Sequence, residues 1–158
     1  MKAASEAQSS SPARGIVPPP NGDVSGARPR VLLAEDDVDT RKMLKHVLLF
    51  AGYDVIEIEN GLELMCYLSS SAVDEVLPPD VIITDIRMPY FSGLDMLRSV
   101  QRCTVAAPVI LISAFCDDKT RELAQKGGAV ALLQKPLAAD QLLAILAELR
   151  PKMTGDAS

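Results

Sequence analysis

The chain has 158 residues, with 16 Lys and Arg against 21 Asp and Glu, so its formal net charge is -5. This length allows one domain of ordinary size, and the acidic balance excludes general binding to nucleic acid or to anionic membranes. Hydrophobic residues make up 48% of the chain and aromatic residues 4%, which excludes a wholly disordered protein and an aromatic base-stacking module. The core must therefore be aliphatic.

The two ends of the chain differ in composition from its middle. Residues 1–29 consist mainly of Ser, Pro, Ala and Gly and carry few large apolar side chains, so we expect a flexible tail. A partner-binding arm or polyproline ligand around Pro18–Pro20 is the minor alternative. Residues 30–150 are expected to form the folded domain, and residues 151–158 a short C-terminal tail.

Five short apolar runs follow one another along the middle of the chain, and a helical pattern follows each of them. The runs predict strands at residues 31–34, 53–59, 81–85, 108–113 and 129–134. Helical spacing with Gly and Pro as stop signals predicts helices from Val38 to a stop at Gly52, from Asn60, over 92–102, over 117–126, and around 142–149 up to Pro151.

Polar residues at the starts of these helices are predicted caps. Asp37 is expected to cap the first helix, because a side-chain oxygen there can accept a hydrogen bond from a free backbone N–H. Asn60 is expected to cap the second helix, with Glu63 as its capping-box partner. Asp117 or Asp118 is expected to cap the fourth.

Short apolar strands that alternate with helices are typical of a parallel sheet, because parallel neighbours need crossover connections. Helices then cover both faces of the sheet, and right-handed crossovers give an open, doubly wound α/β fold. In such sheets the ligand site lies beyond the carboxyl ends of the strands. The chemistry is therefore expected at those strand ends.

Polar and charged side chains stand at the carboxyl ends of four of the predicted strands. They are Glu35 and Asp36 after the first strand, Asp85 after the third, Ser113 after the fourth and Lys135 after the fifth. Each acid taken alone could simply cap the next helix. Asp85, however, directly follows the apolar run VIIT, so its partly buried carboxylate needs partners.

Three carboxylates at one edge of the sheet would repel one another strongly. A divalent cation together with Lys135 would balance the charges of Glu35, Asp36 and Asp85, and Mg2+ suits such a site because it accepts a few carboxylates and keeps waters. The metal would hold a phosphoryl donor beside Asp85, which could attack as an aspartyl nucleophile. Lys135 and Ser113 would contact the incoming phosphoryl oxygens.

Four motifs in this order resemble the receiver domain of two-component response regulators. They are EDDxxxR at 35–41, PDVIITDIRMPYFSGLDML at 79–97, PVILISAF at 108–115 and QKPL at 134–137. The resemblance covers residues 30–150 and implies a flavodoxin-like fold with strand order 2-1-3-4-5. It also implies a stand-alone, single-domain receiver, since only eight residues follow Arg150.

By this resemblance, Asp85 is the phospho-acceptor and takes a phosphoryl group from the phosphohistidine of a sensor histidine kinase. Glu35 and Asp36 match the acidic pair that binds Mg2+, Asp36 most directly and Glu35 through water. The backbone carbonyl of Arg87 matches a further metal ligand. Asp37, the third acid in its run, is better explained by helix capping.

The resemblance assigns further roles around the site. Ser113 matches the hydroxyl that moves toward the phosphoryl group, and Lys135 matches the salt-bridge partner of that group. A cis Lys135–Pro136 peptide is implied, and Gly93 matches the glycine that shapes the loop after the third strand. Leu132 stands where the family usually has an aromatic residue that turns inward on activation, so the aromatic part of the switch is in question.

Phosphorylation changes the charge at Asp85 from -1 to about -2 and adds acceptor oxygens. The new acceptor oxygens attract Ser113 and the backbone near Ala114, which are expected to move inward. The helix at 117–126 has few apolar residues to hold it against the sheet, so it is expected to shift with them. Phe115 and Arg87 flank the site, and we hypothesise that they control the access of water to the acyl phosphate.

Two classes of function fit these residues. The first is a signalling receiver, not an enzyme, whose phosphorylation changes protein contacts through the face formed by 117–126, 129–134 and the last helix. A phosphorelay carrier that passes the group from Asp85 to another histidine is a variant that the sequence does not separate. The second class is a Mg2+-dependent phosphatase with an aspartyl-phosphate intermediate, but its DxD pattern would need an acid where Arg87 stands.

The remaining expectations concern compartment and partners. The cysteines Cys66, Cys103 and Cys116 show no metal-binding spacing, so we expect reduced, mostly buried thiols in a cytoplasmic protein. His46, beside Lys45, is expected to be a solvated side chain rather than a phosphorelay histidine. The sequence shows no signal-peptide pattern and no apolar run long enough to span a membrane, so we expect no membrane insertion. The expected partners are a sensor histidine kinase and a downstream protein, without direct nucleic-acid binding. The chain would be a monomer or a phosphorylation-dependent dimer.

Overall fold

The computed structural model describes residues 28–73, 75–90, 94–95, 97–98 and 107–153. The predictions for the tail at 1–27, for Gly93 and for Cys103 lie outside this part of the chain. The helix predicted at 92–102 also lies mostly outside it, although Leu94, Asp95, Leu97 and Arg98 are helical.

Five parallel strands form one sheet in the order β2-β1-β3-β4-β5. The strands are β1 (Arg30–Ala34), β2 (Asp54–Ile58), β3 (Val81–Asp85), β4 (Val109–Ser113) and β5 (Ala131–Gln134). The doubly wound α/β fold with this strand order is thereby confirmed. Because all five strands point the same way, their carboxyl ends share one edge of the sheet.

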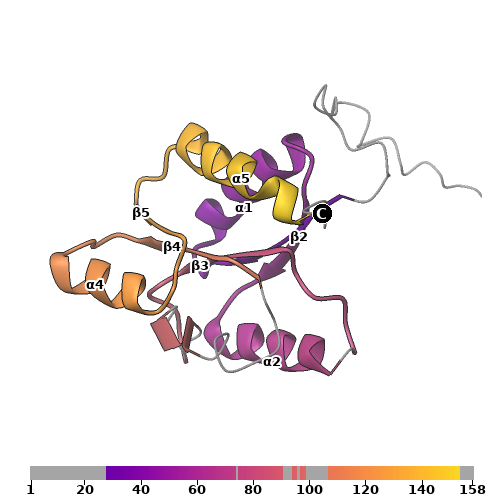
Figure 1. Ribbon diagram of the computed structural model, residues 1–158, viewed down its shortest axis with the longest axis horizontal. Coiled ribbons are helices and arrows are strands. Elements are labelled where there is room, and N and C mark those ends of the chain that lie inside the picture. Colours follow the sequence, from indigo (N-terminus) through magenta and orange to yellow (C-terminus); the bar gives the residue numbers. More distant parts are fainter. Residues whose placement is uncertain (1–27, 74, 91–93, 96, 99–106, 154–158) are drawn as a thin grey trace, which may run out of the picture.

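Helices cover both faces of the sheet (Figure 1). Their bounds are α1 (Val38–Phe50), α2 (Gly61–Ala72), α4 (Asp118–Lys126) and α5 (Ala139–Met153). α1 and α5 pack on one face, whereas α2 and α4 pack on the other. Each helix follows a strand, and α1, α2 and α4 return the chain to the start of the next strand, which is what parallel pairing requires.

Two aliphatic clusters form the core, one on each face of the sheet. Val31 and Leu33 of β1 pack toward α1 and α5, while Leu32 and Ala34 pack toward α2 and α4. This alternation follows from the period of two residues along a strand. The largest fully buried side chains of the described residues are all Leu or Ile, as the low aromatic content predicted.

Side-chain caps begin three of the helices. Asp37 accepts a hydrogen bond from the Thr40 N–H at 2.8 Å, and Asp117 caps α4 in the same way. Asn60 accepts from the Glu63 N–H at 2.9 Å. The predicted capping box is only half formed, because the Glu63 carboxylate accepts from the N–H of Glu59 rather than from that of Asn60. These contacts hold the first turns of α1, α2 and α4 at the edge that carries the strand ends.

Two predictions at the periphery of the domain were wrong. Pro151 does not end the last helix, since α5 continues to Met153; the φ near −65° that proline fixes is compatible with a helix. The thiols are not mostly buried either, because Cys66 is exposed on α2 and Cys116 is half-buried. Glu63 is the one charged residue of α2, so the charge pattern did not show which side of this helix faces solvent.

Gly127, the C-capping residue of α4, lies close to the buried Leu97. A Cβ atom added at Gly127 would lie 2.3 Å from Leu97 Cδ2 and 2.9 Å from its Cγ. We expect Gly127→Ala to lower the free energy of unfolding by about 1–3 kcal/mol, because Leu97 is buried and must shift. Urea denaturation measures this loss, with Gln125→Ala at an exposed position of α4 as the control. If both variants were equally stable, the Leu97 side chain would move away from the added methyl group without cost, and the prediction would be wrong.

Candidate functional site

The carboxyl ends of four strands bring the predicted site residues to one edge of the sheet. Glu35 and Asp36 follow β1, Asp85 ends β3, and Ser113 ends β4. Lys135 directly follows β5, and its N–H donates to the Ser113 carbonyl at 2.9 Å. The topology of the sheet, rather than proximity in the sequence, therefore assembles the site.

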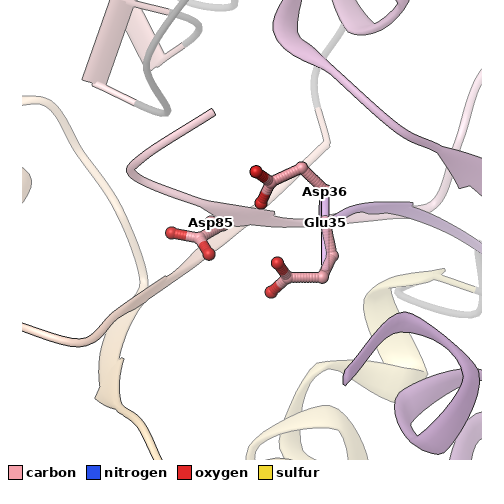
Figure 2. Close-up of side chains that lie close together, drawn as sticks. All are labelled: Glu35, Asp36 and Asp85. Atoms are coloured by element: carbon pink, nitrogen blue, oxygen red, sulfur yellow. The ribbon is translucent and has the colours of Figure 1, made fainter. Parts of the chain in front are cut away.

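Three carboxylates gather at this edge. Glu35, Asp36 and Asp85 each offer one oxygen, and these oxygens all lie within 4.8 Å of one another. Figure 2 shows the three side chains beside the ends of β1 and β3. Glu35 is 0% and Asp85 5% exposed, whereas Asp36 is exposed. Two buried charges and one accessible charge thus form an acidic cluster that is open to solvent on the Asp36 side.

Lys135 is the cation of the cluster. Its Nζ lies 2.5 Å from Asp85 Oδ2 and 2.8 Å from Glu35 Oε1, and the side chain is mostly buried. Burial alone would lower the pKa of Lys135, but its contacts with Asp85 and Glu35 outweigh this and hold that pKa above its ordinary value. The lysine is therefore charged at neutral pH. The implied cis Lys135–Pro136 peptide is present.

Glu35 carries a buried oxygen that lacks a hydrogen bond. Its Oε2 accepts from the Asp37 N–H at 3.0 Å. Oε1 lies within ion-pair distance of Lys135, but the alignment is not that of a hydrogen bond, so this oxygen has no hydrogen-bond donor within the described part of the chain. Burial raises the pKa of Glu35, with the Asp85 charge adding to the effect and Lys135 and the Asp37 amide opposing it.

An oxygen-seeking divalent cation fits this arrangement. A buried carboxylate oxygen without a donor is costly, and a metal ion at the cluster would satisfy it. Carboxylate oxygens are also the ligands that hard cations such as Mg2+ prefer. The three acids at this edge of the sheet could therefore hold a metal ion.

Asp85 is held by a donor at each oxygen. Oδ1 accepts from the Arg87 N–H at 2.9 Å, and Oδ2 contacts the Lys135 ammonium. The preceding strand residues Val81 to Thr84 are fully buried, so they leave this carboxylate little freedom to turn. It is thus fixed at the end of β3, within 4.8 Å of an oxygen of each of the other two acids.

Ser113 is buried and directed toward its own loop. Its Oγ donates to the Phe115 carbonyl at 2.7 Å and accepts from the Phe115 N–H at 3.1 Å. The hydroxyl therefore uses its donor on the backbone of the β4–α4 loop. A hydrogen bond that Ser113 donates toward Asp85 therefore requires its bond to the Phe115 carbonyl to open.

Arg87 and Phe115 meet above the site. The Arg87 guanidinium carbon lies 5.3 Å from the centre of the Phe115 ring, which is cation–π distance. Phe115 is 65% exposed, although it is aromatic. The two residues thus contact each other; that they flank the phosphorylation site stays a prediction.

Arg41 is a residue whose position near the site the sequence did not reveal. It is only 7% exposed, and its Nη1 donates to the Glu35 carbonyl at 2.7 Å. Its guanidinium also pairs with Glu57 at 3.4 Å and with Glu59 at 3.7 Å. The arginine of the EDDxxxR motif was the available signal, but the pattern does not say which carbonyl it would contact.

The other candidate residues lie away from the acidic cluster or at its margin. Leu132 is half-buried on β5 and packs against the core on the α2 and α4 face. His46 is exposed on α1, with its Nδ1 3.1 Å from the Lys42 carbonyl one turn earlier. Nothing in these contacts gives His46 a partner in phosphoryl transfer. Among the described residues, no helix has the length and apolar character needed to cross a membrane.

The strand order together with an acid–lysine cluster at the strand ends defines a CheY-like α/β domain. The family model of the response regulator receiver domain matches residues 31–147, so the chain belongs to this family. Receiver domains are signalling modules rather than classical enzymes, and sensor kinases phosphorylate them.

Individual relatives agree with this assignment. The chain is 34% identical over 117 residues to the C4-dicarboxylate transport transcriptional regulatory protein DctD of Pseudomonas aeruginosa, covering 74% of this chain and 24% of that protein. It is 32% identical to the transcriptional regulatory protein PdtaR of Mycobacterium tuberculosis, covering 78% and 58% respectively. The receiver domain of Francisella response regulator 1452 superposes with a TM-score of 0.71 at 26% identity, covering 79% of this chain and 98% of that domain. The match to the two regulators thus spans only part of their length.

Proposed function

We propose that Asp85 accepts a phosphoryl group from the phosphohistidine of a sensor kinase and that the change alters contacts with other proteins. Mg2+ would be bound by Glu35, Asp36 and Asp85, together with the backbone carbonyl of Arg87. The observation that carries this proposal is the geometry of Asp85: a nearly buried carboxylate, held at both oxygens, next to two acids and one lysine. An acid that only stabilised the fold would not require two further carboxylates and a lysine beside it.

The transfer step follows from these contacts. A carboxylate oxygen of Asp85 forms a bond to phosphorus while the bond from phosphorus to the donor histidine nitrogen breaks, and the electron pair stays on the imidazole. Bound Mg2+ would supply positive charge to the phosphoryl oxygens. Lys135 holds the carboxylate in place beforehand and would turn its ammonium to the new oxygens afterwards. The fixed backbone around Asp85 orients the attacking oxygen.

The phosphoryl oxygens on Asp85 would then compete with the Phe115 carbonyl for the hydrogen bond that the Ser113 hydroxyl donates. The new group carries about one further negative charge and strong acceptor oxygens, which favours a hydrogen bond from the Ser113 hydroxyl. Forming that bond would open the hydrogen bond that Ser113 donates to the Phe115 carbonyl. The β4–α4 loop and the start of α4 would shift, which supports an output face on α4, β5 and α5. With Leu132 in place of an aromatic residue, this backbone route would carry the signal.

Mass spectrometry of the intact full chain tests the proposal. Incubation with a small phosphodonor such as acetyl phosphate and Mg2+ should add one phosphoryl group, and EDTA should prevent it. Asp85→Asn should abolish the addition. Asp54→Asn, an exposed acid that pairs with Arg28 at the other end of the sheet, is the matched control and should label normally. Labelling that survives in Asp85→Asn would refute the proposal.

The Arg87–Phe115 contact gives a second prediction, about the lifetime of the phosphoryl group. Phe115→Ala removes the exposed ring over Arg87 and should speed hydrolysis of the phosphorylated form several-fold, because water then reaches the acyl phosphate more easily. Decay of the labelled mass after removal of the donor measures the rate. An unchanged rate in Phe115→Ala would show that the ring does not limit the access of water.

A further inference from the structure

One backbone hydrogen bond joins α2 to the loop that follows β3. The N–H of Gly61 donates to the carbonyl of Pro89 at 3.0 Å. Gly61 is the first residue of α2, so its N–H is one of the first-turn donors that have no partner inside the helix. The cap Asn60 accepts from the Glu63 N–H instead. The Gly61 donor therefore holds a second segment of the chain, two residues beyond Arg87, whose carbonyl is a proposed metal ligand.

The α2 end of this bond is rigid. The Asn60 side chain accepts from the Glu63 N–H at 2.9 Å, and the Glu63 carboxylate accepts from the Glu59 N–H at 2.8 Å. Leu64, in the first turn of the helix, is fully buried and packs in the core on the α2 and α4 side of the sheet. Gly61 itself is buried. Its N–H therefore occupies a fixed position relative to the sheet.

The loop after β3 is stiff between Arg87 and Pro89. The Arg87 N–H donates to Asp85 Oδ1 at 2.9 Å, and the Met88 side chain packs against the core. The proline ring fixes the φ of Pro89 at about -65°. A residue before proline is also restricted to extended backbone, and this restriction applies to Met88. A displacement of the Pro89 carbonyl is therefore passed on to the Arg87 carbonyl, because the residues between them cannot absorb it.

Tyr90 shows that this loop is held under strain. Its φ is 78°, in the left-handed region that a side chain as large as tyrosine rarely adopts. The side chain gains little packing in return, since the residue is 75% exposed. Such a conformation persists only where the surrounding structure enforces it. The hydrogen bond that fixes the preceding Pro89 carbonyl supplies such a constraint.

We propose that the Gly61 N–H is a positioning group for the metal site: it holds the Pro89 carbonyl and thereby keeps the Arg87 carbonyl in place for Mg2+. This inference rests on the proposed function, because it takes Mg2+ to bind at the acidic cluster. Mg2+ demands near-ideal octahedral geometry, so a small displacement of one ligand weakens its binding. Loss of an outer contact that orients a metal ligand lowers metal affinity by about tenfold or more. A helix outside the acidic cluster thus supports the site.

Chemical-shift titration of the full chain with Mg2+ tests the proposal in two variants at one position. Gly61→Pro removes the donor at the first position of a helix, which accepts proline. Asn60, with φ -154° and ψ 169°, already has the extended backbone required before proline. This variant should bind Mg2+ about tenfold more weakly than the wild type. Gly61→Ala is the matched control, because it keeps the N–H and should bind as the wild type does. Equal affinity of all three proteins, or equal weakening in both variants, overturns the proposal.

Hydrogen exchange in the wild type tests the same coupling without a substitution. Because coupling is reciprocal, saturating Mg2+ should stabilise the Gly61 bond by the factor that this bond adds to Mg2+ affinity. Exchange of the Gly61 amide should therefore slow about tenfold. The Glu63 amide, which donates to Asn60 in the same turn, should exchange at an unchanged rate. In a wild type that binds Mg2+, no slowing at Gly61 or equal slowing of both amides overturns this proposal alone. A wild type that binds no Mg2+ refutes the proposed function as well.

Discussion

Lys135→Met should lower the free energy of unfolding in metal-free buffer by roughly 2 kcal/mol, because it leaves two buried carboxylates without their cation. The Lys135 ammonium lies 2.8 Å from Glu35 Oε1 and 2.5 Å from Asp85 Oδ2. The variant should also accept a phosphoryl group on the order of 100-fold more slowly, since the charge that stabilises the incoming oxygens is lost. Urea denaturation and the rate of phosphodonor labelling measure the two effects.

The stability deficit of Lys135→Met should depend on pH. Burial already raises the pKa of Glu35, and Lys135 opposes this, so removal of the lysine raises that pKa further. Between the unfolded and the folded pKa, the folded state binds a proton that the unfolded state does not, and stability falls as pH rises through this window. The deficit relative to wild type should thus be small in acid and grow toward neutral pH.

Lys126→Met is the matched control for these measurements. Lys126 pairs with Glu122 on the surface of α4 at 2.9 Å, and its side chain is 72% exposed, so its loss should cost less than about 0.5 kcal/mol. It should not affect labelling. A deficit for Lys135→Met that is the same at all pH values, or labelling at the wild-type rate, would contradict the role assigned to Lys135.

Arg41→Ala should be the second damaging change, with a loss of roughly 3 kcal/mol in the free energy of unfolding, because it removes a buried cation from its acceptors. Arg41 fixes the Glu35 carbonyl, and with it the peptide that joins Glu35 to Asp36. Without this bond the acids should lose their alignment, and Mg2+ affinity should fall roughly tenfold. Chemical-shift titration with Mg2+ measures the affinity, and urea denaturation the stability.

Lys45→Ala separates the effect of the Arg41 ion pair with Glu57 from the effect of its hydrogen bond to the Glu35 carbonyl. Lys45 pairs with Glu57 at 2.6 Å, as Arg41 does, but it is partly exposed and has no contact with the Glu35 carbonyl. Its removal should leave Mg2+ affinity unchanged and cost at most about 1 kcal/mol. If Lys45→Ala weakened Mg2+ binding as much as Arg41→Ala, general loss of charge rather than the Glu35 carbonyl contact would explain the effect.

The fold was predictable because its signals are local and repeat. Runs such as VIITD predict buried strands, and the helical patterns between them require parallel pairing. The acids could be placed for the same reason, since parallel strands deliver Asp85 and the Glu35–Asp36 pair to one edge. Capping by Asp37 was predictable too, because the acceptor and the Thr40 N–H lie in one turn.

Features that depend on the path of a loop or on how a helix packs against the sheet were not predictable in this way. The bond from Arg41 to the Glu35 carbonyl depends on how α1 leans on β1, and the spacing of the motif does not define that angle. The hydrogen bonds of Ser113 to Phe115 depend on the path of one loop. The exposure of Cys66 depends on which side of α2 faces the sheet, and the low charge of this helix leaves that side ambiguous.

Reductive trapping of the phosphorylated residue is the most direct test of the central claim. Borohydride reduces an aspartyl phosphate to homoserine at the same position, and peptide mass spectrometry then locates it. After treatment of the full chain with a phosphodonor and Mg2+, we predict homoserine at position 85 alone and none when EDTA is present. Homoserine at another acid, or the same yield at position 85 without a divalent cation, would contradict the account.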